Sequence, residues 1–313
     1  MRKVIGVFLF VLFLPSCPGR GVDTAGKPAV VCSIFVVYDV ARAIGGEEAA
    51  ISLFTPPGAE PHTYEPSARD ILGLKNARLF LYTGGLMEPW ADRVLQAVGG
   101  PTLTATDVTR GIELLTAVEE ESGHTAQGHD HTNGPVDPHF WLDPLRLATA
   151  AGNVEEALVG IDPAHGDLYR QRAAQYRAAL EKLDRDIREG LAGRKGSTLV
   201  YGGHNTFGYF GIRYGLSFIS PYAGFSPQAE PQARKLVELR AMMEKLHLSV
   251  IYYGEGVDPQ VARTLAASVN GRLVMLHAAH NVSAEELAAG VTYLSIMRDN
   301  LAKLKADPGL FGP

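Results

Sequence analysis

Short apolar runs that alternate with helical segments are the feature that most constrains how this chain folds. In the first half, strands are expected at residues 28–34, 51–54 and 77–82, and helices at 36–44, 67–76 and 87–98. The second half repeats the alternation, with strands expected at 198–201, 216–219, 250–253 and 272–276 and helices at 228–246, 259–269 and 284–304. Such alternation is typical of a mostly parallel sheet with helices outside it. Ligands of these sheets bind beyond the carboxyl ends of the strands.

A long helical pattern separates the two halves. It is predicted over residues 162–193, with Asp162 as N-cap and Pro163 at the first helical position. We expect an α/β fold of two lobes, 28–161 and 194–313, each with a mostly parallel sheet flanked by helices, joined by this one rigid helix. A helix that belongs wholly to one domain is the alternative.

Residues 1–27 are expected to be a signal peptide and tether. A basic start precedes an apolar run at 4–14, which is too short to span a bilayer comfortably and has the shape of a secretion signal. The run ends in Leu-Pro-Ser-Cys, which resembles a bacterial lipobox with Cys17 as the lipidated residue. Pro15 is unusual in that pattern, so ordinary signal cleavage is the alternative. We expect an exported protein held at the membrane by a lipid anchor at Cys17.

Charge and cysteine content exclude several classes of protein. The net charge is −5 and there is no basic run, which argues against a nucleic-acid partner. The chain has 2 cysteines, too few for a thiolate zinc finger or metal cluster. Cys32 lies in an apolar, strand-like run and is expected to be a buried, unpaired residue.

Three histidines occupy turns that fix the backbone. His139 lies within P-V-D-P-H-F-W-L-D-P at residues 135–144, whose prolines and aspartates predict a fixed turn. His62 lies in G-A-E-P-H-T-Y-E-P-S, and His204 lies in Y-G-G-H-N-T-F-G-Y-F directly after an expected strand. Neutral imidazole is the commonest metal ligand in proteins. Imidazoles on separate loops at strand ends predict a metal site between the two lobes.

The fourth ligand of this site is open on the residues alone. His277 and His280 both follow the last expected strand, and Glu60 or Glu255 could contribute an oxygen. Four imidazoles without a carboxylate suit zinc or another late transition metal, and suit calcium or magnesium poorly. His124, His129 and His131 lie in the polar stretch 119–134. They either occur there by chance or bind metal ions weakly.

Zinc-dependent catalysis is the rival function. The sequence contains no H-E-x-x-H, no G-x-S-x-G, no P-loop and no G-x-G-x-x-G. An open zinc site made of three histidines and a water could still hydrolyse a substrate, with Glu60, Glu65 or Glu255 as the general base. The spacing of these glutamates selects none of them.

Several motifs together resemble one family. P-H-T-Y-E-P-S-A-R-D at 61–70, D-P-H-F-W-L-D-P at 137–144 and H-N-T-F-G-Y-F at 204–210 resemble the ligand motifs of the metal-specific solute-binding proteins of bacterial ABC transporters, the zinc- and manganese-uptake family. Segments 226–231 and 293–301 are also similar to family segments. The resemblance runs from about residue 28 to residue 304.

The resemblance implies two α/β lobes joined by one long helix, with a metal between them. His62, His139 and His204 correspond to family ligands. Relatives usually have an aspartate at the fourth position, where this chain offers His277 and His280. The number of residues between the ligand and Tyr293 favours His280, which we expect to be the fourth ligand. Position directly after the last expected strand favours His277. An all-histidine set implies Zn²⁺ rather than Mn²⁺. The resemblance further implies a monomer of the periplasm or cell envelope that delivers the metal to an ABC transporter permease.

Overall fold

The computed structural model describes residues 26–99, 102–116, 136–225, 228–256, 259–307 and 309. The expected signal segment, Cys17, and the loop histidines His124, His129 and His131 lie outside the described residues. Within the described ranges, no helix is both long enough and apolar enough to span a bilayer.

The N-terminal lobe contains a parallel sheet of four strands in the order β2-β1-β3-β4. These strands are β1 (Ala29–Cys32), β2 (Ala50–Leu53), β3 (Leu79–Tyr82) and β4 (Thr104–Asp107). Cys32 pairs with Leu53 on one side and with Leu81 on the other, and is buried and free as expected. Sequence reasoning missed β4, because Thr-Ala-Thr-Asp is a polar strand at the sheet edge and lacks the apolar run that marked the others.

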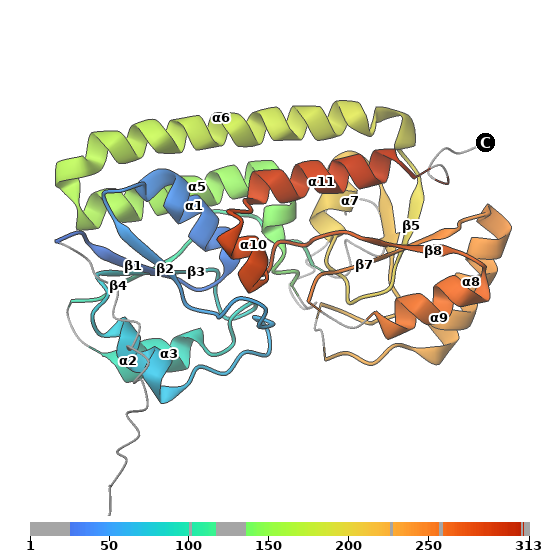
Figure 1. Cartoon of the computed structure of the whole chain (residues 1–313), viewed down its shortest axis with the longest axis horizontal. Coiled ribbons are helices and arrows are strands. Elements are labelled where there is room, and N and C mark those ends of the chain that lie inside the picture. Colours follow the sequence, from blue (N-terminus) through green and yellow to red (C-terminus); the bar gives the residue numbers. More distant parts are fainter. Residues whose placement is uncertain are drawn as a thin grey trace, which may run out of the picture.

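Helices cover both faces of this sheet (Figure 1). On the side of the long helix lie α1 (Phe35–Gly45) and α5 (Pro144–Ile161), and on the opposite side lie α2 (Ala68–Leu74) and α3 (Ala91–Val98). Ser67 caps α2, and Asp70 completes a capping box with it. The helix expected at 87–98 begins only at Ala91.

The C-terminal lobe repeats the arrangement. Its parallel sheet has the order β6-β5-β7-β8, formed by β5 (Thr198–Tyr201), β6 (Ser217–Ile219), β7 (Val250–Tyr253) and β8 (Arg272–Met275). Its helices are α7 (Gly208–Tyr214), α8 (Ala233–Leu246), α9 (Gln260–Ser268), α10 (Ala284–Ala288) and α11 (Tyr293–Lys305). Each four-stranded sheet therefore uses the same strand order, and the expected α/β class is confirmed.

The long helix α6 (Gly166–Gly190) runs along both lobes (Figure 1). It is shorter than the predicted 162–193, because Pro163–His165 and Ala192–Arg194 form 3-10 turns at its two ends. At 1.5 Å per residue its 25 residues extend about 37 Å. Its buried face includes Tyr169, Ala173, Tyr176, Leu180, Leu183 and Ile187. This face packs into a hydrophobic core that contains residues of both lobes, so the lobes share buried surface in addition to the helix.

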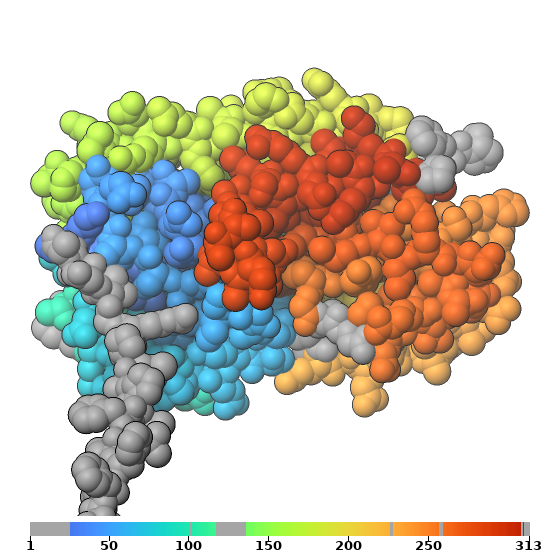
Figure 2. All heavy atoms as spheres, in the orientation of Figure 1, coloured from blue at the N-terminus to red at the C-terminus, as the bar shows by residue number. Residues whose placement is uncertain are grey.

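Two helix predictions in the C-terminal lobe were wrong in extent. The helix expected at 228–246 begins at Ala233, since Pro231 lacks the amide proton that a helix interior requires. The helix expected at 284–304 is divided into α10 and α11. Gly290 adopts a φ of 73° after α10, and Thr292 begins α11 with a capping box to Ser295. Figure 2 shows α10 at the boundary between the two lobes.

Candidate metal centre

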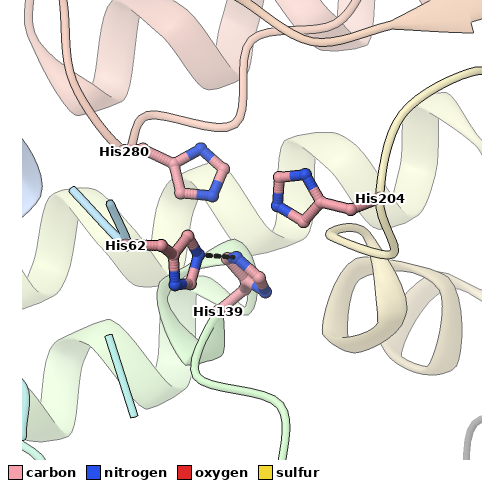
Figure 3. Close-up of side chains that lie close together, drawn as sticks. All are labelled: His62, His139, His204 and His280. Carbon is pink, nitrogen blue, oxygen red and sulfur yellow. Dashed lines mark hydrogen bonds between the residues drawn. The ribbon is translucent and has the colours of Figure 1, made fainter. Parts of the chain in front are cut away.

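Four imidazoles converge between the two lobes (Figure 3). The side chains are those of His62, His139, His204 and His280, and one ring nitrogen of each lies within 4.8 Å of the others. Nε2 of His62 and Nε2 of His139 are 3.3 Å apart. Two nitrogens that share a tetrahedral zinc ion at about 2.05 Å lie roughly 3.3 Å apart. The spacing of the His62 and His139 nitrogens therefore matches that of two ligands of one ion, and the other two nitrogens lie within 4.8 Å of them.

Strand ends and one fixed turn position the four rings. His62 lies in the turn that follows β2, His204 follows β5, and His280 follows β8. His139 lies directly before a 3-10 turn, η1 (Phe140–Leu142), which leads into α5. Because the carboxyl ends of parallel strands meet at one edge of a sheet, both lobes present imidazoles to the boundary between them. The three predicted turns thus meet, as their sequence indicated.

Asp137 orients His139. Its Oδ1 lies 2.6 Å from Nδ1 of His139 and also accepts the backbone N–H of His139 at 2.9 Å. Both side chains are fully buried. A proton on Nδ1 that is donated to the carboxylate leaves Nε2 bare and directed at the other rings. Sequence reasoning treated Asp137 only as a turn residue. The signal that could have found it is its position two residues before a predicted ligand.

Glu255 has the corresponding role at His280. It follows β7, and its Oε1 lies 3.2 Å from Nδ1 of His280 and accepts the backbone N–H of the same residue. Its Oε2 accepts the N–H of Ala278 at 2.7 Å. Burial acts to raise the pKa of Glu255, but the neighbouring His277 and His280 lower that pKa to about 2. The carboxylate is therefore ionised and acts on the ring of His280.

His277, the alternate fourth ligand, faces away from the group. Its Nδ1 accepts the N–H of Ala279 at 2.9 Å, and its Nε2 lies 3.8 Å from Oε1 of Glu286. Between the two histidines, Ala279 adopts a φ of 58°, which is rare for a residue with a side chain. This left-handed residue turns the chain so that His280, and not His277, joins the other three rings.

The other residues considered from the sequence have local roles. Oε1 of Glu60 accepts the backbone N–H of His62 at 3.0 Å. Glu65 is exposed. His165 pairs through Nδ1 with Oδ2 of Asp162 at 2.7 Å on the surface. His247 forms the left-handed C-cap of α8.

Burial keeps three of the rings neutral. Burial, with a smaller contribution from nearby His280, lowers the pKa of His62 to about 2 and that of His204 to about 3. The pKa of His139 lies well below its usual value for the same reasons. Burial also opposes the charged form of His280, but Glu255 outweighs it and raises the pKa of this ring. Neutral imidazoles are the form that binds a metal.

Two of the nitrogens are unsatisfied. Nε2 of His204 and Nε2 of His280 are buried and have no hydrogen-bond partner among the described residues. Buried polar atoms are nearly always paired in native structures, so each such atom requires an explanation. A cation bound at the centre of the four rings would provide one for both.

Comparison with known proteins agrees with this geometry. The sequence model of the family described as "ZnuA: Zinc-uptake complex component A periplasmic" matches residues 30–307, which is most of the chain. The chain belongs to this ZnuA family. The resemblance seen in the histidine turns is therefore confirmed across both lobes.

Named ZnuA-family relatives are zinc proteins. The zinc-binding lipoprotein AdcA of Streptococcus pneumoniae (strain ATCC BAA-255 / R6) is 31% identical over 308 residues, 97% of this chain and 60% of that protein. The chain thus spans less than two thirds of AdcA. The high-affinity zinc uptake system protein ZnuA of Bacillus subtilis (strain 168) is 30% identical over 304 residues, covering 96% of this chain and 95% of that protein.

Solved structures extend the agreement to the fold. The crystal structure of Zn(II)-bound AdcA from Streptococcus pneumoniae superposes with a TM-score of 0.75 at 29% identity, over 92% of this chain and 59% of that chain. ZnuA-family members are zinc-uptake components and not enzymes, and the hydrolase alternative finds no support among these relatives.

Proposed function

We propose that this protein captures Zn²⁺ between its two lobes and delivers it to an ABC transporter permease. The observation that carries the proposal is the group of four ring nitrogens, one each from His62, His139, His204 and His280, within 4.8 Å of one another. Four protein nitrogens fill a tetrahedral zinc sphere and leave no position for the water that catalysis requires. Such a closed site suits capture and release of the ion as cargo.

The donor set favours zinc over manganese. Imidazole suits zinc and other late transition metals, whereas manganese prefers carboxylate and carbonyl oxygens. The carboxylates of Asp137 and Glu255 touch the outer nitrogens of two rings, so they act on the ligands. Zinc sites commonly show this carboxylate–histidine arrangement, which orients the ring and raises its basicity.

Export and anchoring are part of the proposal. We infer that residues 1–27 direct the chain out of the cytoplasm and that Cys17 is lipidated, which holds a monomeric protein at the cell envelope. The lipobox-like Leu-Pro-Ser-Cys and the lipoprotein name of the AdcA relative support this inference. Membrane fractionation tests it, because a Cys17→Ser variant should move from the membrane fraction to the soluble fraction.

Growth in zinc-limited medium tests delivery. Deleting the gene from its source organism is expected to slow growth when zinc is chelated, and added zinc should restore it. Expression of the wild-type chain should restore growth without added zinc, whereas a chain with His62, His204 and His280 all changed to alanine should not. Uptake of radioactive zinc by the same cells measures transport directly. Undiminished uptake in the deletion strain would refute delivery.

Replacing Asp137 with asparagine is expected to weaken zinc binding by about ten- to a hundredfold, the usual cost of losing an outer carboxylate. Asparagine keeps the size of the side chain, but it removes the negative charge that acts on Nδ1 of His139. A chelator competition titration measures the change.

Asp162→Asn is the matched control, because Asp162 holds Nδ1 of His165 in the same way on the surface. The control should bind zinc like the wild-type protein. Equal affinities of the two variants would contradict the role given to Asp137.

A further inference from the structure

Asn281 joins the loop that carries His280 to the turn that carries His62. Its side-chain amide donates one hydrogen bond to the carbonyl oxygen of Pro56 and another to that of Ala59, both at 2.7 Å. These partners lie 225 and 222 residues away along the chain, in the other lobe. One side chain therefore bridges the two lobes beside the metal centre.

Backbone contacts strengthen the same junction. The N–H of Gly58 donates to the carbonyl oxygen of Val282 at 2.9 Å, and the N–H of Phe35 donates to that of His280 at 3.3 Å. Asn281 itself is only 6% exposed, and its Oδ1 accepts the N–H of Val282 at 2.8 Å. Both N–H groups of the amide thus hold the junction, and the amide oxygen is bound within its own loop.

The junction restricts the positions of two rings at once, because few residues separate it from His62 and His280. His280 immediately precedes Asn281, and only Glu60 and Pro61 separate Ala59 from His62. Proline restricts the backbone of this short connection. The rings of His62 and His280 lie with their centroids 5.9 Å apart.

His204 is held differently, by contacts within its own lobe. The hydroxyl of Ser220 donates to the carbonyl oxygen of Gly203 at 2.5 Å, and the N–H of Asn205 donates to that of Gly224 at 3.3 Å. Other buried hydrogen bonds also join the lobes near the site: Trp141 donates to the carbonyl oxygen of Ala278 at 2.7 Å, and Tyr209 donates to that of Asp137 at 2.8 Å. The Asn281 junction is the one that ties the loop of His280 to the turn of His62.

We infer that Asn281 is a positioning residue for metal capture. Its amide holds His62 and His280, which come from opposite lobes, in their binding arrangement before the ion arrives. This inference rests on the proposed zinc-binding function. Groups that are already in place lose less conformational freedom on binding, so the arrangement increases affinity and slows dissociation. The role requires an amide, because its two N–H groups face two carbonyl oxygens.

The surroundings of Asn281 allow the test without loss of the fold. A cavity of about 110 Å³ borders it, together with Glu60, Glu255 and Glu286. A cavity of this size with carboxylates in its wall has room for water. Water there can satisfy the carbonyl oxygens of Pro56 and Ala59 when the amide is removed.

The chain contains a matched control. Asn153 on α5 donates its side-chain amide to the carbonyl oxygens of Val108 and Arg110, both at 2.8 Å, within the N-terminal lobe. Asn281→Asp and Asn153→Asp therefore remove the same pair of donors, but only the first change affects the junction beside the site.

The test compares zinc affinity, the zinc dissociation rate and the visible spectrum of the Co²⁺-loaded proteins. Asn281→Asp is expected to lose about tenfold or more in affinity, mainly through faster dissociation. Its Co²⁺ spectrum should shift, because a displaced ring changes the coordination. Asn153→Asp should match the wild-type protein in all three measurements, although both variants can melt at lower temperature. A merely structural role for Asn281 would lower the melting temperature without changing the spectrum.

Two further measurements keep the inference testable if Asn281→Asp does not fold. Asn281→Ser removes the amide without adding charge, and it should show the same loss of affinity. In the wild-type protein, hydrogen exchange at the N–H of Gly58 should be slow before zinc is added.

Three outcomes would overturn the inference. One is rapid exchange of that amide in the metal-free protein, and another is an Asn281 variant that equals Asn153→Asp in affinity and spectrum. The third is a wild-type protein that binds no zinc, which removes the proposed function itself. The second outcome, with zinc bound tightly by the wild-type protein, rejects only the role of Asn281.

Discussion

Replacing His139 with alanine is expected to weaken zinc binding by about a hundredfold or more. Structural zinc sites with four protein ligands bind with about 10–16 kcal/mol, so an even share for one ligand is about 3 kcal/mol. His139 is fully buried and lies closest to the centre of the group, with its ring centroid 5.3 Å from that of His62, 5.6 Å from that of His204 and 4.8 Å from that of His280. A competition titration against a zinc chelator of known affinity measures the loss.

His165→Ala is the control for this experiment. His165 is a surface histidine paired with Asp162, so its loss removes an imidazole without touching the four-ring group. We expect it to bind zinc like the wild-type protein. Circular dichroism should show that both variants are folded. Wild-type affinity in the folded His139 variant would refute the metal centre described above.

Acidification is expected to release zinc by protonating one ring first. Binding requires neutral imidazole, and the pKa values of His62 and His204 are lowered to about 2 and 3 by burial, so these rings stay neutral well below pH 5. The pKa of His280 is raised by Glu255, so this ring takes up a proton first as the pH falls. Affinity should therefore be nearly constant at high pH and then fall about tenfold per pH unit below the raised pKa.

Calorimetric titrations in buffers of different ionisation enthalpy measure the number of protons released on binding. We expect up to one proton per zinc ion near the raised pKa, and fewer at higher pH. Glu255→Gln removes the charge that raises the pKa of His280, so it should move the onset of the loss to lower pH while weakening binding overall. An affinity that is unchanged from pH 8 to pH 5, or the release of three protons, would contradict the charge states described here.

Local sequence patterns predicted much of the metal centre. Prolines around His139, and the strand ends before His62 and His204, hold these rings through backbone preferences that depend on near neighbours. The same short-range patterns indicated both parallel sheets and the long helix between the two halves. They missed β4, whose polar edge strand is stabilised by pairing with β3, and they missed the break between α10 and α11.

Other features depend on contacts between distant segments. Asp137 and Glu255 became recognisable as partners of the rings only when their oxygens were seen beside Nδ1 of His139 and of His280. Asn281 offered no signal in the sequence, because its partners lie in the other lobe. Side chains of this kind act through long-range hydrogen bonds, and local propensity carries no information about such bonds.

The sequence by itself determined the α/β alternation, the three histidine turns and the family to which they point. The tertiary structure decided which of two nearby histidines joins them. Trp141 donates its indole N–H to the carbonyl oxygen of Ala278 at 2.7 Å, and Oδ1 of Asn300 accepts the backbone N–H of His277 at 2.9 Å. These long-range contacts hold the loop in which Ala279 is left-handed, so His280 points into the group while His277 points away. A turn imposed by distant partners cannot be read from its own four residues, which is why the sequence left both histidines as candidates.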